Sequence, residues 1–196
     1  MIRILKTTIA IMFLILCAVV LASPRAVPLN SAEELPLYPP IKIEAPTPSA
    51  PVQLSIDKIG IYTTIESVGI SIGGSMAVPE NVNNVGWYNK GAVPGEPGTA
   101  VLAGHVNSRG GGDAVFTRLH ELEIGDKIRV TNDQGRVETF VVRNTLRYSV
   151  LADTSDIFTS TDGLSHLNLI TCEGVWSSLF KTHNRRLVIF TDKIEE

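Results

Sequence analysis

Residues 127–148 read KIRVTNDQGRVETFVVRNTLRY, two runs rich in apolar and β-branched residues on either side of the polar segment Asn132-Asp133-Gln134-Gly135. Short apolar runs bounded by turn residues are typical of β-strands. The same pattern recurs from Val52 onward, and helical periodicity is nearly absent. The sequence therefore predicts eight strands, at residues 52–56, 61–68, 75–78, 99–103, 127–131, 137–148, 167–171 and 187–191.

Eight short strands with so little helix predict an all-β domain, folded as a closed barrel or a sandwich. One short helix is expected at Ala114–Leu122, because Asp113 follows three glycines and suits the N-cap. A composition of 44% hydrophobic and 19% charged residues fits a single globular domain. The net charge of -3 provides no basic surface for a phosphate backbone, so no nucleic-acid partner is expected.

The N-terminal segment predicts export. Arg3 and Lys6 precede the apolar run Ile9–Ala22, which is a secretory targeting pattern. The run is shorter than the roughly 20 residues of a full membrane span. Cleavage before Ser23 is nevertheless disfavoured by the adjoining Pro24, so residues 1–22 are expected to remain as a membrane anchor. The basic residues on the N-terminal side of the run orient the remainder of the chain outside the cytoplasm.

Proline and glycine are distributed unevenly along the chain. Eight of the eleven prolines lie between Pro24 and Pro51, whereas all sixteen glycines lie at or after Gly60. A proline-rich segment of this kind tends to an extended, semi-rigid conformation. Residues 23–51 are therefore predicted to be a linker, and residues 52–196 the folded domain.

Cys172 has no cysteine partner in the exported domain, because Cys17 lies inside the apolar run. Exported domains usually pair their thiols. An unpaired thiol in such a domain is either a buried filler or a group kept for chemistry. A nucleophilic thiol needs a neighbouring base or cation, because the thiolate is the reactive form.

His105 is the favoured base. It directly follows the strand TAVLAG, at a position where Gly104 allows a close approach of the backbone. Cys172 ends the strand LNLIT, so both residues are expected at strand ends, from which a rigid barrel can direct side chains into one groove. The weaker candidates lie in the expected helix, at a strand start and in a polar loop, and are His120, His166 and His183.

Arg185 and Arg186 precede the strand LVIF. Adjacent strand residues point to opposite faces, so only one of the two can reach the groove. An arginine there could donate hydrogen bonds to a developing oxyanion, and it stays charged at any relevant pH.

Three separated segments resemble the sortase family of cysteine transpeptidases, and above all its class F members. They are GWYNKGAVPGEPGTAVLAGHV at 86–106, NLITCEG at 168–174 and RRLVIF at 185–190, in order within about residues 52–194. The Leu-x-Thr-Cys pattern of the family is present as Leu169–Cys172. The threonine that often precedes it is Asn168 here, a departure expected to affect strand packing more than chemistry.

The resemblance implies an eight-stranded sortase β-barrel and a transpeptidation in two steps. Cys172 would cleave an LPXTG-like sorting signal between Thr and Gly through a thioester, and an amine acceptor of the cell envelope would release the product. His105 would act first as acid and then as base. The register favours Arg186 over Arg185 as the charge-stabilising arginine. The enzyme is expected to be a membrane-anchored, extracytoplasmic monomer that needs no cofactor.

Residues 149–165 and 173–184 flank the Cys172 strand and are expected to form the walls of the groove. The acidic residues Asp113, Glu121 and Glu123 lack the spacing of a calcium-binding EF-hand loop, so no required metal is predicted. Other functions remain open. An L,D-transpeptidase-like enzyme would carry Ser-His-Gly-Cys where this chain has Ile170-Thr171 before Cys172, and a non-catalytic surface barrel would not need the Cys, His and Arg set. A hydrolase that trims surface proteins would use the same residues as a transpeptidase.

Overall fold

The computed structural model describes residues 49–179 and 182–195. The predicted anchor at residues 1–22 and nearly all of the predicted linker lie outside these ranges. The folded domain begins with a strand at Pro51, one residue before the predicted boundary. Within the described ranges, no helix is both long and apolar enough to cross a membrane.

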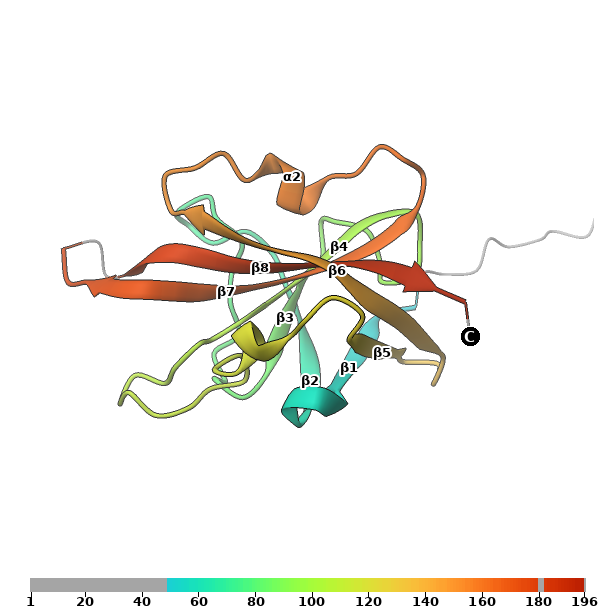
Figure 1. Ribbon diagram of the computed structural model, residues 1–196, viewed down its shortest axis with the longest axis horizontal. Helices are drawn as coiled ribbons and strands as arrows, with labels where there is room; N and C mark the ends of the chain where they lie inside the picture. Colours follow the sequence, from blue (N-terminus) through green and yellow to red (C-terminus); the bar gives the residue numbers. More distant parts are fainter. Residues whose placement is uncertain (1–48, 180–181, 196) are drawn as a thin grey trace, which may run out of the picture. The chain divides into compact units, whose positions relative to one another are not determined.

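The eight strands close into a barrel in the order β1-β2-β3-β4-β7-β8-β6-β5 (Figure 1). The predicted eight-stranded closed barrel is confirmed. The β2–β3 and β4–β7 pairs are parallel, and the others are antiparallel. The strands are β1 (Pro51–Ile56), β2 (Ile61–Val68), β3 (Val85–Tyr88), β4 (Gly98–Gly104), β5 (Lys127–Asn132), β6 (Val137–Ser149), β7 (Ser165–Ser177) and β8 (Thr182–Ile194). The helical turns are η1 (Asp57–Ile59), η2 (Leu119–Glu121) and the short helix α2 (Ser155–Phe158).

Alternate residues of β7 and β8 belong to two different apolar clusters. Leu169 and Ile189 are fully buried in the large cluster inside the barrel. Val188 and Phe190 are buried on the outer face, against Ile157 of α2. Residues 150–164, here called the cover segment, therefore pack on the outside of the β7–β8 part of the sheet, where Figure 1 shows α2 above the strands. The same outer face carries every second residue of β7.

Two predicted elements are wrong. Residues 75–78 form only an isolated bridge between Met76 and Ile70, and the strand that the prediction missed is β3. Pro79 ends the apolar run at 75–78, whereas Gly86 within β3 allows a tight approach: a Cβ there would lie 2.9 Å from a methyl group of Val68. A four-residue strand that contains glycine has a weak signal in the sequence.

The predicted helix at Ala114–Leu122 is a series of three-residue turns that ends in η2. The amide of Phe116 donates to the carbonyl of His105, and the Thr117 hydroxyl donates to the carbonyl of Val106. These contacts tie the segment to the chain after β4. Its own amides bond three residues back, as Leu119 does to Phe116, instead of four residues back as in an α-helix.

The strand carrying Cys172 does not end at Glu173-Gly174, contrary to the prediction. Pairing with β8 is interrupted between Glu173 and Trp176 and then continues to Ser177. Gly174 has a φ of 85°, which accommodates this irregularity. Cys172 thus lies where β7 leaves the barrel and continues into a long hairpin with β8, seen at one end of the molecule in Figure 1.

Gly104→Ala is expected to destabilise the domain by about 1–3 kcal/mol through overpacking. A Cβ at this position would lie 2.5 Å from Cδ2 of Phe116 and 2.8 Å from Cγ1 of Val115. The Phe116 ring is buried in the core and has no open space to enter. Urea unfolding measures the effect, with Gly110→Ala as control because a Cβ there meets nothing within 4 Å. Equal unfolding free energies for the two variants would contradict the packing argument.

Candidate active site

A groove of about 500 Å³ lies on the outer face of the sheet, beside the end of β4 and the middle of β7 and β8. Its floor includes Gly104, Ile170 and Cys172. One wall is the cover segment, and the other is the loop at residues 69–79 after β2. The wall residues are Ile70, Gly74, Ser75, Met76 and Val78 on one side and Val150, Ala152, Thr154 and Phe158 on the other.

Cys172 and Arg186 lie directly opposite each other on β7 and β8. Residues that are paired across antiparallel strands have their side chains on the same face, close enough to contact a common ligand. Both side chains are half-buried and line the groove. The structure therefore brings together the predicted nucleophile and one of the two predicted arginines.

Arg186 is held by the first residues of β8. Its Nη1 donates to the carbonyls of His183 and Arg185, at 3.1 and 2.9 Å, and its Nη2 donates to the Thr182 hydroxyl at 3.0 Å. A guanidinium has five N–H donors. Within the described residues these bonds use three of them, which leaves two for a ligand in the groove.

Arg185 has a different environment. It is exposed, it is paired with Glu173 rather than with Cys172, and it is absent from the groove lining. Strand alternation therefore separates the two arginines as the sequence analysis expected. The carboxylate of Glu173 forms an ion pair with Arg147 at 2.9 Å.

His105 directly follows β4, and the registers of β4 and β7 place it beside Cys172. The parallel pairing ends at Ala103 and Ile170, so both His105 and Cys172 lie two residues beyond the same pair. The buried hydroxyl of Thr171 donates to the carbonyl of Gly104 at 2.8 Å and joins the two strands at this point. The side chain of His105 does not line the groove itself.

The imidazole of His105 is oriented by the 69–79 loop. Its Nε2 lies 2.9 Å from the carbonyl oxygen of Pro79. A carbonyl can only accept, so Nε2 carries a proton in this contact. The second nitrogen, Nδ1, is then the position that can gain or lose a proton.

The other histidines have structural partners. His120 is exposed, and its Nδ1 contacts the carbonyl of Thr117. The ring of His183 packs edge-on against Trp176 on the hairpin, with centroids 5.4 Å apart. His166 lies at the far end of β7, between two carboxylates. His105 is the histidine that the β4–β7 register places level with Cys172.

The groove walls agree only in part with the prediction. The cover segment forms one wall, as expected from residues 149–165. The other expected wall was 173–184, yet no described residue of that range lines the groove. The 69–79 loop, which was predicted to contain a strand, takes this place. The hairpin extends away from the groove because β7 and β8 remain paired beyond Gly174.

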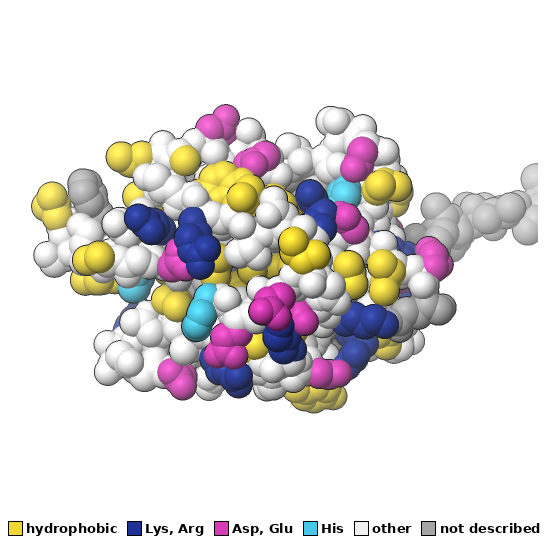
Figure 2. Space-filling model, viewed as in Figure 1, with side chains coloured by type: hydrophobic (Ala, Val, Ile, Leu, Met, Phe, Trp, Pro, Cys, Tyr) yellow, Lys and Arg dark blue, Asp and Glu magenta, His cyan; other side chains and the backbone are white. Residues whose placement is uncertain are grey.

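Charged side chains of both signs are interspersed on the face shown in Figure 2, so that face has no field of a single sign.

Burial raises the pKa of Tyr148 to about 12, and its hydrogen bond to Asp156 adds to the shift. Tyr148 therefore stays neutral and continues to donate to Asp156 at physiological pH. Throughout the ranges 49–179 and 182–195, no three His, Cys, Asp or Glu side chains are grouped so that they could hold a metal ion.

Residues 54–194 match the family model described as the sortase domain. The chain belongs to the sortase family. It is accordingly a sortase-type transpeptidase, with its three resembling segments inside the matched range. No curated protein sequence matches the chain.

Solved sortase structures share this fold. Sortase C1 from Streptococcus agalactiae superposes with a TM-score of 0.58 at 19% identity, over 74% of this chain and 67% of that one. A sortase D5 transpeptidase from Clostridium perfringens gives 0.56 at 23% identity, over 74% and 79%. A lid mutant of sortase A from Corynebacterium diphtheriae gives 0.58 at 19% identity, over 80% and 75%. At these identities the likeness concerns the fold alone.

Proposed function

We propose that this sortase cleaves an LPXTG-like sorting signal between Thr and Gly and transfers the released surface protein to an amine of the cell envelope. One observation carries the proposal. Cys172 and Arg186 face the same groove from paired positions, and His105 is at the matching position of the next strand. This arrangement supplies a nucleophile, a proton carrier and a fixed positive charge, which are the requirements of acyl transfer through a thioester.

In the first step, the Cys172 thiolate attacks the Thr carbonyl carbon and forms the C–S bond. The carbonyl oxygen becomes an oxyanion, and the free N–H groups of Arg186 donate to it. Protonation of the glycine nitrogen by Nδ1 of His105 then lets the C–N bond break. The products of this step are a thioester on Cys172 and a free glycine amine.

In the second step, an amine takes the place of the departed glycine. Nδ1 of His105 removes a proton from this amine as it attacks the thioester carbonyl. Collapse of the second oxyanion breaks the C–S bond and restores Cys172. The floor and walls of the groove, which include Ile170 and Phe158, supply an apolar surface for the sorting peptide.

Class F is the proposed class, because segments 86–106, 168–174 and 185–190 resemble that class most. The sortases named among the structural neighbours are of classes A, C and D. Peptide-library profiling of the purified domain tests the class assignment together with the sorting motif.

The direct test incubates the domain with LPXTG peptides in which X is varied, and follows the protein by mass spectrometry. An adduct on Cys172 with the mass of the peptide up to Thr supports the proposed thioester. A second arm adds a glycine oligomer: a transpeptidase converts the peptide into the amide product, whereas a trimming hydrolase yields the free acid with or without amine. Absence of both adduct and cleavage for every peptide would favour a non-catalytic barrel.

The membrane anchor is a second proposal, since its residues precede the described part. The full-length protein is expected to sediment with membranes because of the apolar run at residues 9–22. Deletion of residues 1–48 retains all eight strands and should leave a soluble, active domain. Cell fractionation and N-terminal sequencing check this, and a secreted protein that begins at Ser23 would contradict the retained anchor.

A further inference from the structure

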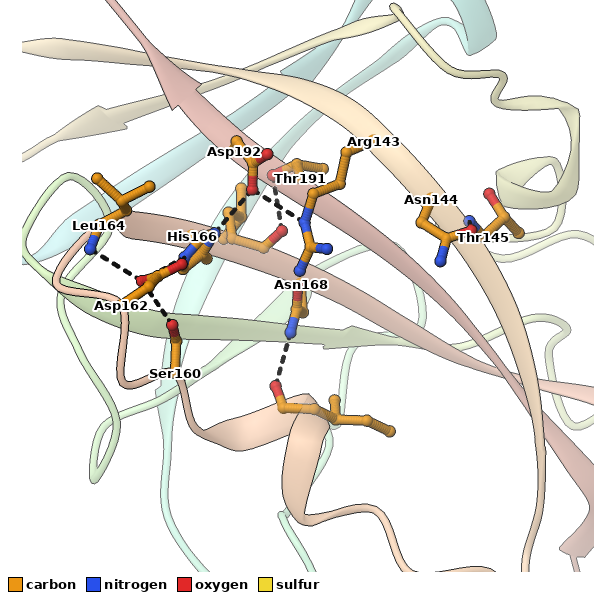
Figure 3. A network of polar contacts seen from close by, with 12 residues as sticks. Arg143, Asn144, Thr145, Ser160, Asp162, Leu164, His166, Asn168, Thr191 and Asp192 are labelled. Carbon is orange, nitrogen blue, oxygen red and sulfur yellow. Dashed lines mark hydrogen bonds and ion pairs between the residues drawn. The ribbon is translucent and has the colours of Figure 1, made fainter.

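The strand that carries Cys172 also holds the cover segment in place. His166, Asn168, Ile170 and Cys172 are alternate residues of β7 and therefore share the outer face of the sheet. Ile170 and Cys172 line the groove. His166 and Asn168 lie nearer the N-terminal end of β7. Figure 3 shows His166 bonded to the cover segment and to β8, and Asn168 bonded to the cover segment.

His166 joins the end of the cover segment to the barrel. Only 5% of this residue is exposed. Its Nδ1 lies 2.7 Å from Asp192 on β8, and its Nε2 lies 3.0 Å from Asp162 in the cover segment (Figure 3). Arg143 on β6 adds an ion pair to Asp192 at 2.9 Å. An imidazolium donates to both carboxylates, whereas a neutral ring has a single N–H.

Asp162 is fixed on its own segment as well. Its Oδ1 accepts from the amide of Leu164 at 2.9 Å and from the hydroxyl of Ser160 at 2.7 Å, while Oδ2 faces His166. The Leu164 amide, the Ser160 hydroxyl and then His166 hold the pKa of Asp162 well below its usual range. The Asp162 carboxylate therefore stays charged.

Asn168 provides a second attachment. It is 1% exposed, and its Nδ2 donates to the carbonyl of Ile157 in α2 at 2.7 Å (Figure 3). This is the position where the sequence departs from the family pattern of threonine. The effect of the departure extends beyond the packing of β7 itself, because the amide of Asn168 bonds the helix that carries part of the groove wall.

Phe158 connects the helix that Asn168 bonds to the groove. It follows Ile157 in α2, it lines the groove, and its ring packs edge-on against Tyr88, with centroids 5.5 Å apart. Tyr88 lines the groove from β3. The position of α2 therefore sets the width of the groove between Phe158 and the opposite wall.

We propose that Asp162, His166 and Asn168 are positioning residues that fix the cover segment and thereby set the affinity for the sorting peptide. The inference rests on the proposed function, since it assigns the peptide to this groove. If these residues only stabilised the fold, their substitution would lower the free energy of unfolding. It would not raise KM selectively while leaving kcat unchanged.

The test compares Asp162→Asn and Asn168→Ala with Asp153→Asn as matched control. The asparagine of Asp162→Asn keeps an oxygen for Leu164 and Ser160 but turns an amide toward His166. Asp153 lies in the same segment and accepts from the amide of Ser155 at 2.9 Å, which asparagine can also do. Each of the two test variants should raise KM for an LPXTG peptide about 10-fold, with kcat within about 2-fold. Alkylation of Cys172 by iodoacetamide should keep its wild-type rate.

Equal KM values in wild type and Asp162→Asn, or a matching rise in Asp153→Asn, would overturn the inference, and so would a loss confined to kcat. Hydrogen exchange gives a readout that needs no substrate. The amide of Ile157, which bonds the carbonyl of Thr154, should exchange about 10-fold faster in Asp162→Asn than in Asp153→Asn. If the wild type cleaves no peptide, the proposed function fails while this exchange measurement still decides whether the segment is held as described.

Discussion

Cys172→Ala is expected to reduce kcat/KM for sorting peptides by at least about 10³-fold, because the variant has no nucleophile for the thioester. Cys172→Ser is expected to be similarly inactive, since a serine hydroxyl is far less acidic than a thiol and forms an anionic nucleophile much less readily. Cleavage of an LPXTG peptide measured by chromatography, together with the absence of a covalent adduct, checks the result.

The Cys172 variants should keep the fold. Cys172 is half-buried and belongs to neither apolar cluster, so its truncation leaves no large cavity. An unfolding free energy within about 1 kcal/mol of wild type is expected. Turnover by Cys172→Ala comparable to that of the wild type would remove Cys172 as the nucleophile and would reopen the function.

Arg186→Ala is expected to lose about 10²–10³-fold in kcat, equivalent to about 2.7–4 kcal/mol, as for removal of one oxyanion donor. Arg185→Ala is the matched control and should stay within about 3-fold of wild type, because its exposed side chain is paired with Glu173 and does not line the groove. Single-turnover measurement of acylation separates an effect on the chemical step from an effect on peptide binding.

The Arg186→Lys variant tests whether the role of Arg186 needs the planar hydrogen-bonding geometry of the guanidinium or only its positive charge. Lysine keeps the positive charge but cannot donate two parallel hydrogen bonds while also holding Thr182 and the carbonyl of His183. We expect poor rescue. Good activity of the lysine variant would indicate charge attraction alone, and a dead Arg185→Ala variant would transfer the role to the other arginine.

Seven of the eight strands were predictable because each is a local pattern of apolar residues between turn residues. That pattern left a barrel and a sandwich open, and the resemblance to the sortase family favoured the barrel. Alternation is equally local: once Cys172 and Arg186 are assigned to paired strands, only one of two adjacent arginines can share the face of the cysteine. The errors fall on segments with weak local signals. Residues 85–88 contain a glycine. The amides of 114–122 bond three residues back along the chain, while Phe116 and Thr117 also bond to the chain after β4.

Short motifs and the periodicity of the chain were enough to predict the family and most of the strands, and to select candidate residues for the chemistry. The choice of the loops that form the groove depended instead on how the barrel folds. The 69–79 loop holds His105 through the carbonyl of Pro79, and the cover segment packs over β7 through His166 and Asn168. These contacts join residues that are distant in sequence. No local pattern specifies them, because they arise when the barrel closes and brings separate loops to one end of the sheet.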